Sequence, residues 1–545
     1  MHSAKANAGT RSCLNISDVN PGFEVTKQSA GAPHIRVFCE CVGVCAIRGA
    51  LTLAVLTALL LITARPAHAQ GEAALYNFCA QPNCTDGNGP QSRLTSDGAG
   101  NFYGTTASGG AFGYGTVFEV SANGSGGWNE SVLYSFCSEG APNCTDGAYP
   151  AYSYVIFDSA RNLYGTAAMG GANGCGVVFE LSPTGTSWME TVLFSFGLSG
   201  SGCAPVNGLI MDRAGNLYGV TNSFGDGTET VFELSQVAGV WTQQMIYDLG
   251  IAAPNSAGLT MDAAGNIFGT SLSTVFELSP NGSGGWNPTV IHTFTGAPKD
   301  GSDVRGTPAL DQYGNLYGTT DEGGERNYGT VYRLTPGQNG KWTEKVLYSF
   351  YGPPYHYNPW AGVVLDAAGN IYGTTLDGGE GGSVFELLVP VGKAKYKEKA
   401  LWAFDGEDGN EPYGSLILDS LGNLYGTTAG VYPTVFHGNV FGVNPSAAVT
   451  STTFTSSPNP SSKGQEVTYT ATVTSSAGPP PDGETVTFLC CQDLQFKVGT
   501  GTLNAGVASV ASSIVGNNFV IAVYAGDMNF TASKSEKRRQ VVKPK

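Results

Sequence analysis

A motif of the form Asn-Leu-Tyr-Gly-Thr recurs through most of the chain and constrains the fold more than any other feature. It begins seven times, at Asn101, Asn162, Asn216, Asn266, Asn315, Asn370 and Asn423, with spacings of 49 to 61 residues. A repeat of about 50 residues built from strand-like pieces is typical of β-propeller blades. We therefore predict an all-β protein in which residues 70–446 form a seven-bladed β-propeller.

Each repeat divides into four strand-like pieces. Residues 208–212, 115–120 and 132–136 are examples of the first, third and fourth pieces, and the motif itself is the second. The turn between the first two pieces typically reads Asp-x-x-Gly-Asn, and Gly and Asn tolerate the positive φ of a tight turn. Four antiparallel strands make one blade. We expect the aromatic ring of each motif to pack between neighbouring blades.

The two ends of the repeat region are complementary. Residues 73–78 match the fourth strand of a repeat, whereas the seventh repeat ends with its third strand at 438–443. We expect 75–78 to become the outer strand of the last blade, because this closure leaves no open edge between the first and last blades.

The whole motif string resembles a known family. Asn-Leu-Tyr-Gly-Thr-Thr, then Gly-Gly, then Gly-Thr-Val-Phe-Glu-Leu is similar to the GloVer tandem-repeat proteins over residues 73–445, although the fourth repeat has a short loop at 271–274. The resemblance implies an exported bacterial protein whose C-terminal anchor varies between members, and it implies no particular reaction. A weaker similarity, through Asp-x-x-Gly-Asn-x-Tyr, links the repeats to NHL and gluconolactonase-like propellers.

The composition changes after residue 446. Residues 447–451 read as a linker, and alternating Thr, Ser and Val residues with regular turns follow. This pattern is typical of a β-sandwich. It resembles the bacterial Ig-like repeats of exported proteins, through Ser-Pro-Asn-Pro at 457–460 and Val-Tyr-Ala-Gly-Asp at 523–527. We predict one immunoglobulin-like β-sandwich over residues 447–545, with a solvated basic tail from Lys534.

The first 69 residues are predicted to be a leader that contains a secretory signal peptide. Ala50 to Ala64 is an apolar run, with Arg48 before it and Ala67-His68-Ala69 after it, which is the order of a signal peptide and its cleavage site. A transmembrane helix needs about 20 apolar residues. We expect a secreted or cell-surface protein without stable membrane insertion after cleavage; an uncleaved anchor is the alternative.

The charge of the chain excludes one class of partner. The net charge is −16, and removing the six basic and three acidic residues of the leader changes it to −19. A polyanion such as nucleic acid would be repelled. We expect a monomer whose partner is an extracellular glycan or protein ligand.

Eight of the 12 cysteines follow the leader, and an even number in an exported chain favours disulfides. The expected pairs are Cys79–Cys84, Cys137–Cys144 and Cys175–Cys203. The first two pairs flank equivalent loops, and the third joins two loops on one face of the propeller. Cys490 and Cys491 are adjacent, so their side chains should point to opposite faces of a strand. We expect them to remain thiols rather than form a vicinal disulfide.

Residues that carry catalytic chemistry are scarce. The three histidines after the leader, His292, His356 and His437, lie far apart in the sequence, and no zinc-protease or serine-hydrolase motif is present. We predict no catalytic residues, no metal and no cofactor. The Asp-Gly pairs at Asp86, Asp146, Asp300 and Asp408 are interpreted as turns; a calcium site would need six to eight oxygen ligands.

Two classes of function remain, because propellers host both. The first is a binding or scaffold protein that recognises a glycan or another extracellular ligand through loops on one face. The alternative is a lyase, lactonase or glycosidase-like enzyme that acts at the central channel. Three or more converging Asp, Glu or His side chains at a channel mouth would favour the enzyme.

The loops between blades carry the candidate binding residues. Aromatic side chains on a rigid scaffold suit recognition, and these loops contain several, including Tyr152. The connection from Tyr351 to Trp360 is the richest. We predict that Tyr355, Tyr357 and Trp360 stack on a neutral ligand such as a glycan; the alternative is a proline-stiffened loop that packs on its own blade.

Overall fold

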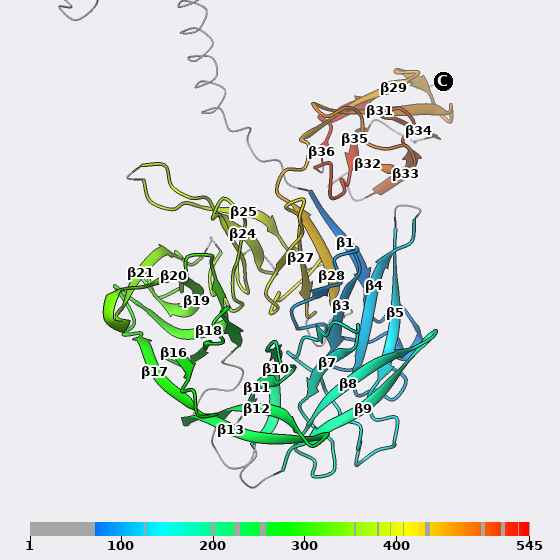
Figure 1. The fold of residues 1–545 in the computed structure, drawn as a ribbon. Helices are drawn as coiled ribbons and strands as arrows, with labels where there is room; N and C mark the ends of the chain where they lie inside the picture. The colour runs from blue at the N-terminus through cyan, green and yellow to red at the C-terminus, as the bar shows by residue number, and fades with distance from the viewer. Residues whose placement is uncertain are drawn as a thin grey trace, which may run out of the picture. The chain divides into compact units, whose positions relative to one another are not determined.

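The computed structural model describes residues 71–543 apart from 125–126, 198–201, 223–228, 251–257, 354–355, 379–380, 393, 407, 431–436, 492–495, 514–517 and 532. The predicted leader therefore lies outside the described residues. The part of the chain that is described is all-β, with two short 3₁₀ turns, η1 (Pro82–Cys84) and η2 (Gln338–Gly340), and no α-helix (Figure 1).

In the described part of the chain, seven four-stranded antiparallel sheets follow one another, and in six of them all four strands are in sequence order. Sheet 1 contains β2 (Thr95–Ser96), β3 (Phe102–Thr106), β4 (Thr116–Ala122) and β5 (Trp128–Ser135). Sheet 2 contains β6 (Ile156–Phe157), β7 (Leu163–Ala167), β8 (Val177–Thr184) and β9 (Ser187–Ser195). Sheet 3 contains β10 (Cys203–Met211), β11 (Leu217–Asn222), β12 (Glu229–Val237) and β13 (Val240–Gly250).

The remaining four sheets repeat this order, except that the seventh takes its outer strand from the start of the chain. Sheet 4 contains β14 (Leu259–Met261), β15 (Ile267–Ser271), β16 (Thr274–Pro280) and β17 (Trp286–Thr293). Sheet 5 contains β18 (Gly301–Leu310), β19 (Leu316–Gly323), β20 (Thr330–Pro336) and β21 (Trp342–Ser349). Sheet 6 contains β22 (Val364–Leu365), β23 (Ile371–Thr375), β24 (Ser383–Leu387) and β25 (Glu398–Ala403). Sheet 7 contains β26 (Ile417–Leu418), β27 (Leu424–Thr428), β28 (Asn439–Asn444) and β1 (Gly71–Asn77).

The Asp-x-x-Gly-Asn motif forms the turn between the first two strands of each sheet. In sheet 1, Asp97 Oδ1 accepts hydrogen bonds from the backbone N–H groups of Ala99 and Asn101, and Oδ2 accepts one from the Asn101 side chain at 2.8 Å. The same set recurs at Asp158, Asp212, Asp262, Asp311, Asp366 and Asp419. The motif therefore recurs because each turn needs the same carboxylate and amide.

An aromatic pair joins each sheet to the next. A ring from the fourth strand, or just after it, lies 4.8 to 5.4 Å from a ring on the third strand of the following sheet. The pairs are Phe136–Phe179, Phe196–Phe232, Tyr247–Phe276, Phe294–Tyr332, Phe350–Phe385, Phe404–Phe441 and, from sheet 7 to sheet 1, Phe78–Phe118. The last sheet thus packs on the first in the same way as any other two neighbours.

The segment before the first repeat completes the seventh sheet, as the sequence predicts. β1 runs antiparallel to β28, with Ala73 opposite Gly442 and Asn77 opposite Asn439. This pairing gives β28 a partner on the side that would otherwise be an open edge.

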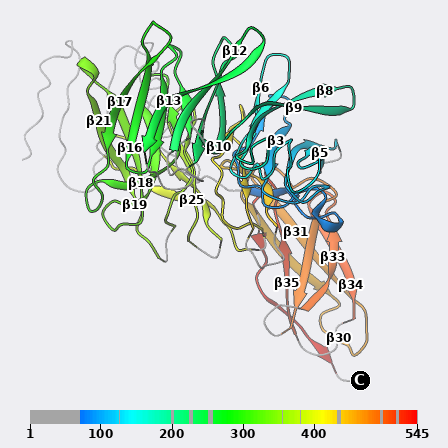
Figure 2. The same ribbon diagram turned by 90° about the horizontal axis from the view of Figure 1, so that it is seen from below.

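Residues after the linker form two packed sheets, drawn in orange and red in Figure 2. One contains β29 (Thr450–Ser457), β31 (Val467–Ser475) and β34 (Val507–Ser512), and the other contains β33 (Phe496–Thr502), β32 (Thr485–Cys490), β35 (Asn518–Tyr524), β36 (Ser533–Lys534) and β37 (Arg538–Gln540). The short strands β30 (Ser461–Ser462) and β38 (Val542–Lys543) pair in parallel. The core between the sheets includes the buried rings of Tyr469, Phe488 and Tyr524.

The expectation that Cys490 and Cys491 remain thiols is wrong, because the two residues form a disulfide. Strand alternation does not extend to the second cysteine. Cys490 is the last residue of β32, and Cys491 has a φ of 76°, outside the extended region. The bond joins the buried core to the residue just beyond the strand.

Candidate functional site

The first strands of all seven sheets line one cavity of about 820 Å³. The residue just before the turn aspartate is apolar in six sheets, and each of the six side chains is half-buried and lines this cavity. These residues are Phe157, Met211, Met261, Leu310, Leu365 and Leu418. The cavity is therefore a channel along the inner edges of the sheets, and its wall combines a ring of apolar side chains with polar groups.

A second, smaller cavity of about 50 Å³ adjoins the channel. Arg93, Tyr154, Thr307 and Ser415 line both spaces, which places the small cavity at one end of the large one. This narrow end lies at the connections that lead into the first strands.

Three half-buried aromatic residues line the narrow end and are called here the aromatic mouth: Tyr152, Trp360 and Tyr413. The ring of Tyr413 contacts Tyr152 at 5.9 Å and Trp360 at 5.8 Å, both edge to face. Each of the three comes from a different connection between sheets. Pro359 and Pro412 directly precede two of them and restrict the backbone there.

Charged groups surround the aromatic mouth. The Arg305 guanidinium lies 4.0 Å from the ring centroid of Trp360 and pairs with Asp303 at 2.6 Å. Burial raises the pKa of Asp321 to about 6, against the opposing effect of nearby Arg305. Burial also raises the pKa of Tyr413, and the carboxylate of Glu411 adds to the shift.

The predicted stacking residues have different surroundings. Trp360 belongs to the aromatic mouth. Tyr357 instead contacts the Tyr328 ring at 5.3 Å, and its backbone pairs with Asp377. Tyr355 lies outside the described residues. The structure thus brings Trp360 together with Tyr152 and Tyr413 rather than with Tyr357.

Tyr413 was not among the predicted aromatic residues, although the sequence holds a signal for it. An aromatic residue follows a proline at Pro359-Trp360 and again at Pro412-Tyr413, at the same place in two repeats. Only a comparison of the connections with one another would have shown this equivalence.

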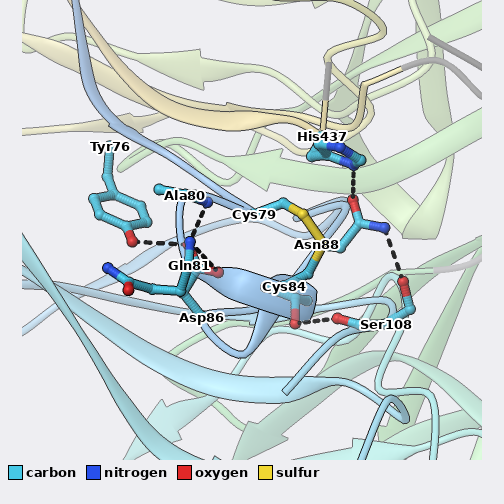
Figure 3. Close-up of a disulfide and its surroundings, with 10 residues drawn as sticks. Tyr76, Cys79, Ala80, Gln81, Cys84, Asp86, Asn88, Ser108 and His437 are labelled. Carbon is cyan, nitrogen blue, oxygen red and sulfur yellow. Dashed lines mark hydrogen bonds between the residues drawn. A yellow bond between two sulfur atoms is a disulfide. The ribbon is translucent and has the colours of Figure 1, made fainter. Parts of the chain in front are cut away.

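The structure pairs the six cysteines of the repeat region as the sequence predicts, Cys79–Cys84, Cys137–Cys144 and Cys175–Cys203. Figure 3 shows the first of these bonds beside His437, whose Nδ1 lies 3.1 Å from Asn88 Oδ1. Among the described residues, Cys79, Cys84 and His437 are the one group of three with metal-ligand spacing. Both sulfur atoms are held in the disulfide, so this group offers no thiolate.

The aspartates of the Asp-Gly pairs accept hydrogen bonds from residues in the same connection between sheets. Asp86 Oδ2 accepts hydrogen bonds from Tyr76 and from the backbone of Ala80, both at 2.8 Å (Figure 3). Asp146 and Asp300 accept equivalent bonds from Ser138 and Thr295. These contacts account for the recurrence of Asp-Gly as turn structure.

Within the described part of the chain, no helix has the length and apolar character needed to span a membrane. Carboxylates at the aromatic mouth do not form a cluster with metal-ligand spacing among these residues.

The fold and the repeated turns define an all-β repeat protein with a C-terminal Ig-like module. Residues 68–274 and 271–478 match the Gloeobacter/Verrucomicrobia repeat, and residues 454–543 match the bacterial Ig-like domain, group 3. Because the repeat matches cover most of its length, the chain belongs to the Gloeobacter/Verrucomicrobia repeat family. This agrees with the resemblance seen in the motifs. No curated protein sequence matches the chain.

Solved structures with detectable similarity are distant. An extracellular domain assigned to a two-component system of B. thetaiotaomicron is 11% identical, with a TM-score of 0.42; the match covers 88% of this chain and 60% of that domain. A gluconolactonase from Xanthomonas campestris is 12% identical, with a TM-score of 0.31, over 57% of this chain and 96% of that enzyme. An α-L-arabinanase from Penicillium chrysogenum is 14% identical, with a TM-score of 0.35, over 53% and 92% of the two chains. We infer neither fold nor function from similarities this weak.

Proposed function

We propose that the seven sheets are the blades of one closed β-propeller that spans residues 70–446, preceded by an export leader over 1–69 and followed by the Ig-like domain over 447–545. Seven equivalent aromatic pairs between successive sheets support this arrangement, since the Phe78–Phe118 pair joins the last sheet to the first. The channel wall also takes residues from the first strand of every sheet.

This propeller acts outside the cell as a binding protein, and its aromatic mouth recognises a neutral glycan. The observation that carries the proposal is the position of Tyr413, whose ring contacts both Tyr152 and Trp360 at the narrow end of the channel. Aromatic rings offer large, rigid surfaces with an apolar face, which suits contact with the C–H faces of sugar rings. Their rotamer freedom is already reduced by these contacts, so binding costs little ordering entropy.

Compartment and charge agree with this assignment. Disulfides persist in oxidising environments such as the cell exterior. The chain is strongly acidic, and Arg305 at the mouth is paired with Asp303, so a neutral ligand is favoured over a polyanion. The protein acts as a monomer on this account.

One observation favours the enzymatic alternative, a lyase, lactonase or glycosidase-like reaction at the same end of the channel. The Asp321 carboxyl has a pKa raised to about 6 by burial, and its Oδ1 is buried without a hydrogen-bond partner among the described residues. A carboxyl group whose pKa is raised toward neutral pH is suited to general acid catalysis. Hydrolysis of a glycosidic bond would need a second carboxyl group in position.

A glycan screen of the secreted protein tests both ideas when binding and product release are measured together. We expect Trp360→Ala and Tyr413→Ala to weaken binding at least about tenfold, which is about 1.4 kcal/mol. Tyr313→Ala is the matched control, because Tyr313 is 76% exposed on the turn between β18 and β19. Full affinity in both folded mouth variants would refute the binding site. Product release that disappears in Asp321→Asn would establish the enzyme instead.

A further inference from the structure

We propose that the channel is a second binding site, distinct from the aromatic mouth, and that it takes an anionic amphiphile such as a long-chain carboxylate. The carboxylate would pair with Arg93 at the narrow end, and the hydrocarbon chain would contact the ring of apolar side chains in the channel wall. This site does not depend on the glycan proposal, because it uses the interior of the channel.

The channel has the size of a small-molecule site, and part of its wall is apolar. Its volume of about 820 Å³ falls within the range of about 300–1,000 Å³ that is usual for ligand pockets. Met211, Met261, Leu310, Leu365 and Leu418 present half-buried apolar side chains to it. Apolar surface that remains in contact with water is costly, and flexible Met side chains adapt to varied apolar ligands.

Arg93 supplies the charge that selects the head group. Its guanidinium carbon lies 4.2 Å from the ring centroid of the buried Tyr154, which fixes the side chain in place. Among the described residues it forms no ion pair or hydrogen bond, and its Nε is buried without a partner. Arg93 lines both cavities, so it lies where the channel narrows. An arginine held this way matches a carboxylate, which can accept two parallel hydrogen bonds.

Among the described residues that line the channel, Arg93 is the one cation. The turn aspartates follow the apolar wall residues in sequence, and Asp419 lines the channel. Asp419 accepts hydrogen bonds from the backbone of Leu421 and from the Asn423 side chain. A ligand with its anionic group at Arg93 and its apolar end toward Asp419 therefore fits the charge distribution better than the reverse orientation.

Calorimetric titration with octanoate, decanoate and dodecanoate below their micelle concentrations tests the site. We expect the affinity to rise up to about fourfold for each added methylene, the factor that corresponds to full burial of the chain. Arg93→Met should weaken dodecanoate binding at least tenfold while leaving dodecanol binding within about twofold. Met211→Gln, which changes polarity at nearly constant length, should weaken both ligands severalfold.

Arg326→Met is the matched control. Arg326 also stacks on a tyrosine, with 5.2 Å between its guanidinium carbon and the Tyr351 ring, but it lies exposed on a loop. This variant should bind dodecanoate like the unmodified protein.

Affinity that does not depend on chain length, or an Arg93→Met protein with unchanged dodecanoate binding, would overturn the proposal. Tighter binding of dodecyltrimethylammonium than of dodecanoate would overturn it as well. Loss of glycan binding in the mouth variants with dodecanoate binding retained would support two separate sites.

Discussion

Thr427 in the last repeat donates a hydrogen bond from Oγ1 to the backbone carbonyl of Ser92 in the first, at 2.8 Å. The residues are 335 positions apart, yet the bond repeats a contact found between neighbouring sheets. Thr319, at the same motif position, bonds in this way to the carbonyl of Ala361 at 2.7 Å. The last and first repeats are thus joined by the same hydrogen bond as two successive repeats within the chain.

This equivalence predicts the effect of removing the hydroxyl. Thr427→Val and Thr319→Val should each lower the free energy of unfolding by about 1–3 kcal/mol, because each leaves a buried carbonyl without its donor. The measurement is urea unfolding of the two variants and the parent protein. If Thr319→Val destabilises the protein and Thr427→Val does not, the last and first repeats do not form the joint described here.

A second prediction concerns pH. Burial, reinforced by the nearby carboxylates of Asp146 and Glu139, raises the pKa of Glu190 from 4.5 to about 8. The folded state therefore holds a proton that the unfolded state releases, so the contribution of this group favours folding below about pH 4.5 and declines as the pH rises toward 8. Glu190→Gln should match the parent protein at pH 5 and exceed its stability at pH 8.5.

The control for this titration is Glu325→Gln, since Glu325 is exposed. Its unfolding free energy should follow that of the parent protein at both pH values. A Glu190→Gln protein with the same difference from the parent at pH 5 and pH 8.5 would contradict the assignment of this buried carboxyl.

The loss of unfolding free energy on removing a disulfide should increase with the length of the loop that the disulfide closes. Cys175 and Cys203 are separated by 28 residues in sequence, whereas Cys79 and Cys84 are separated by five. The chain-entropy relation gives about 3.5 kcal/mol for the longer loop and about 2 kcal/mol for the shorter. Replacing each pair with alanines and measuring chemical unfolding should reproduce this order. A larger loss for the Cys79–Cys84 pair would show that the bond near His437 stabilises the folded state by contacts rather than by chain entropy.

Much of the fold is readable from the sequence because the repeats carry their own turn chemistry. Each Asp-x-x-Gly-Asn marks a hairpin, and the strand-like segment at 73–78 has no partner within its own repeat, which indicates closure by the last one. The aromatic mouth was only partly predictable. Tyr152 and Trp360 are recognisable in the sequence as loop aromatics. Their shared contact with the Tyr413 ring, however, depends on how separate connections converge around the channel. Sequence spacing does not encode that convergence.

The disulfide between Cys490 and Cys491 shows another limit of prediction from sequence. Strand periodicity predicts opposite side-chain directions only while the strand continues. β32 ends at Cys490, and the positive φ of the next residue is not visible in the pattern of residue types.

Both proposed binding sites require a closed ring, and deleting residues 71–78 tests closure most directly. This segment supplies β1, and Phe78 supplies the aromatic contact to Phe118. Calorimetry of the protein with and without the segment should show a clear fall in the melting temperature of the repeat region and a broader, less cooperative transition. The melting of the Ig-like domain provides an internal reference. An unchanged, equally cooperative propeller transition in the shortened chain would contradict the closed ring.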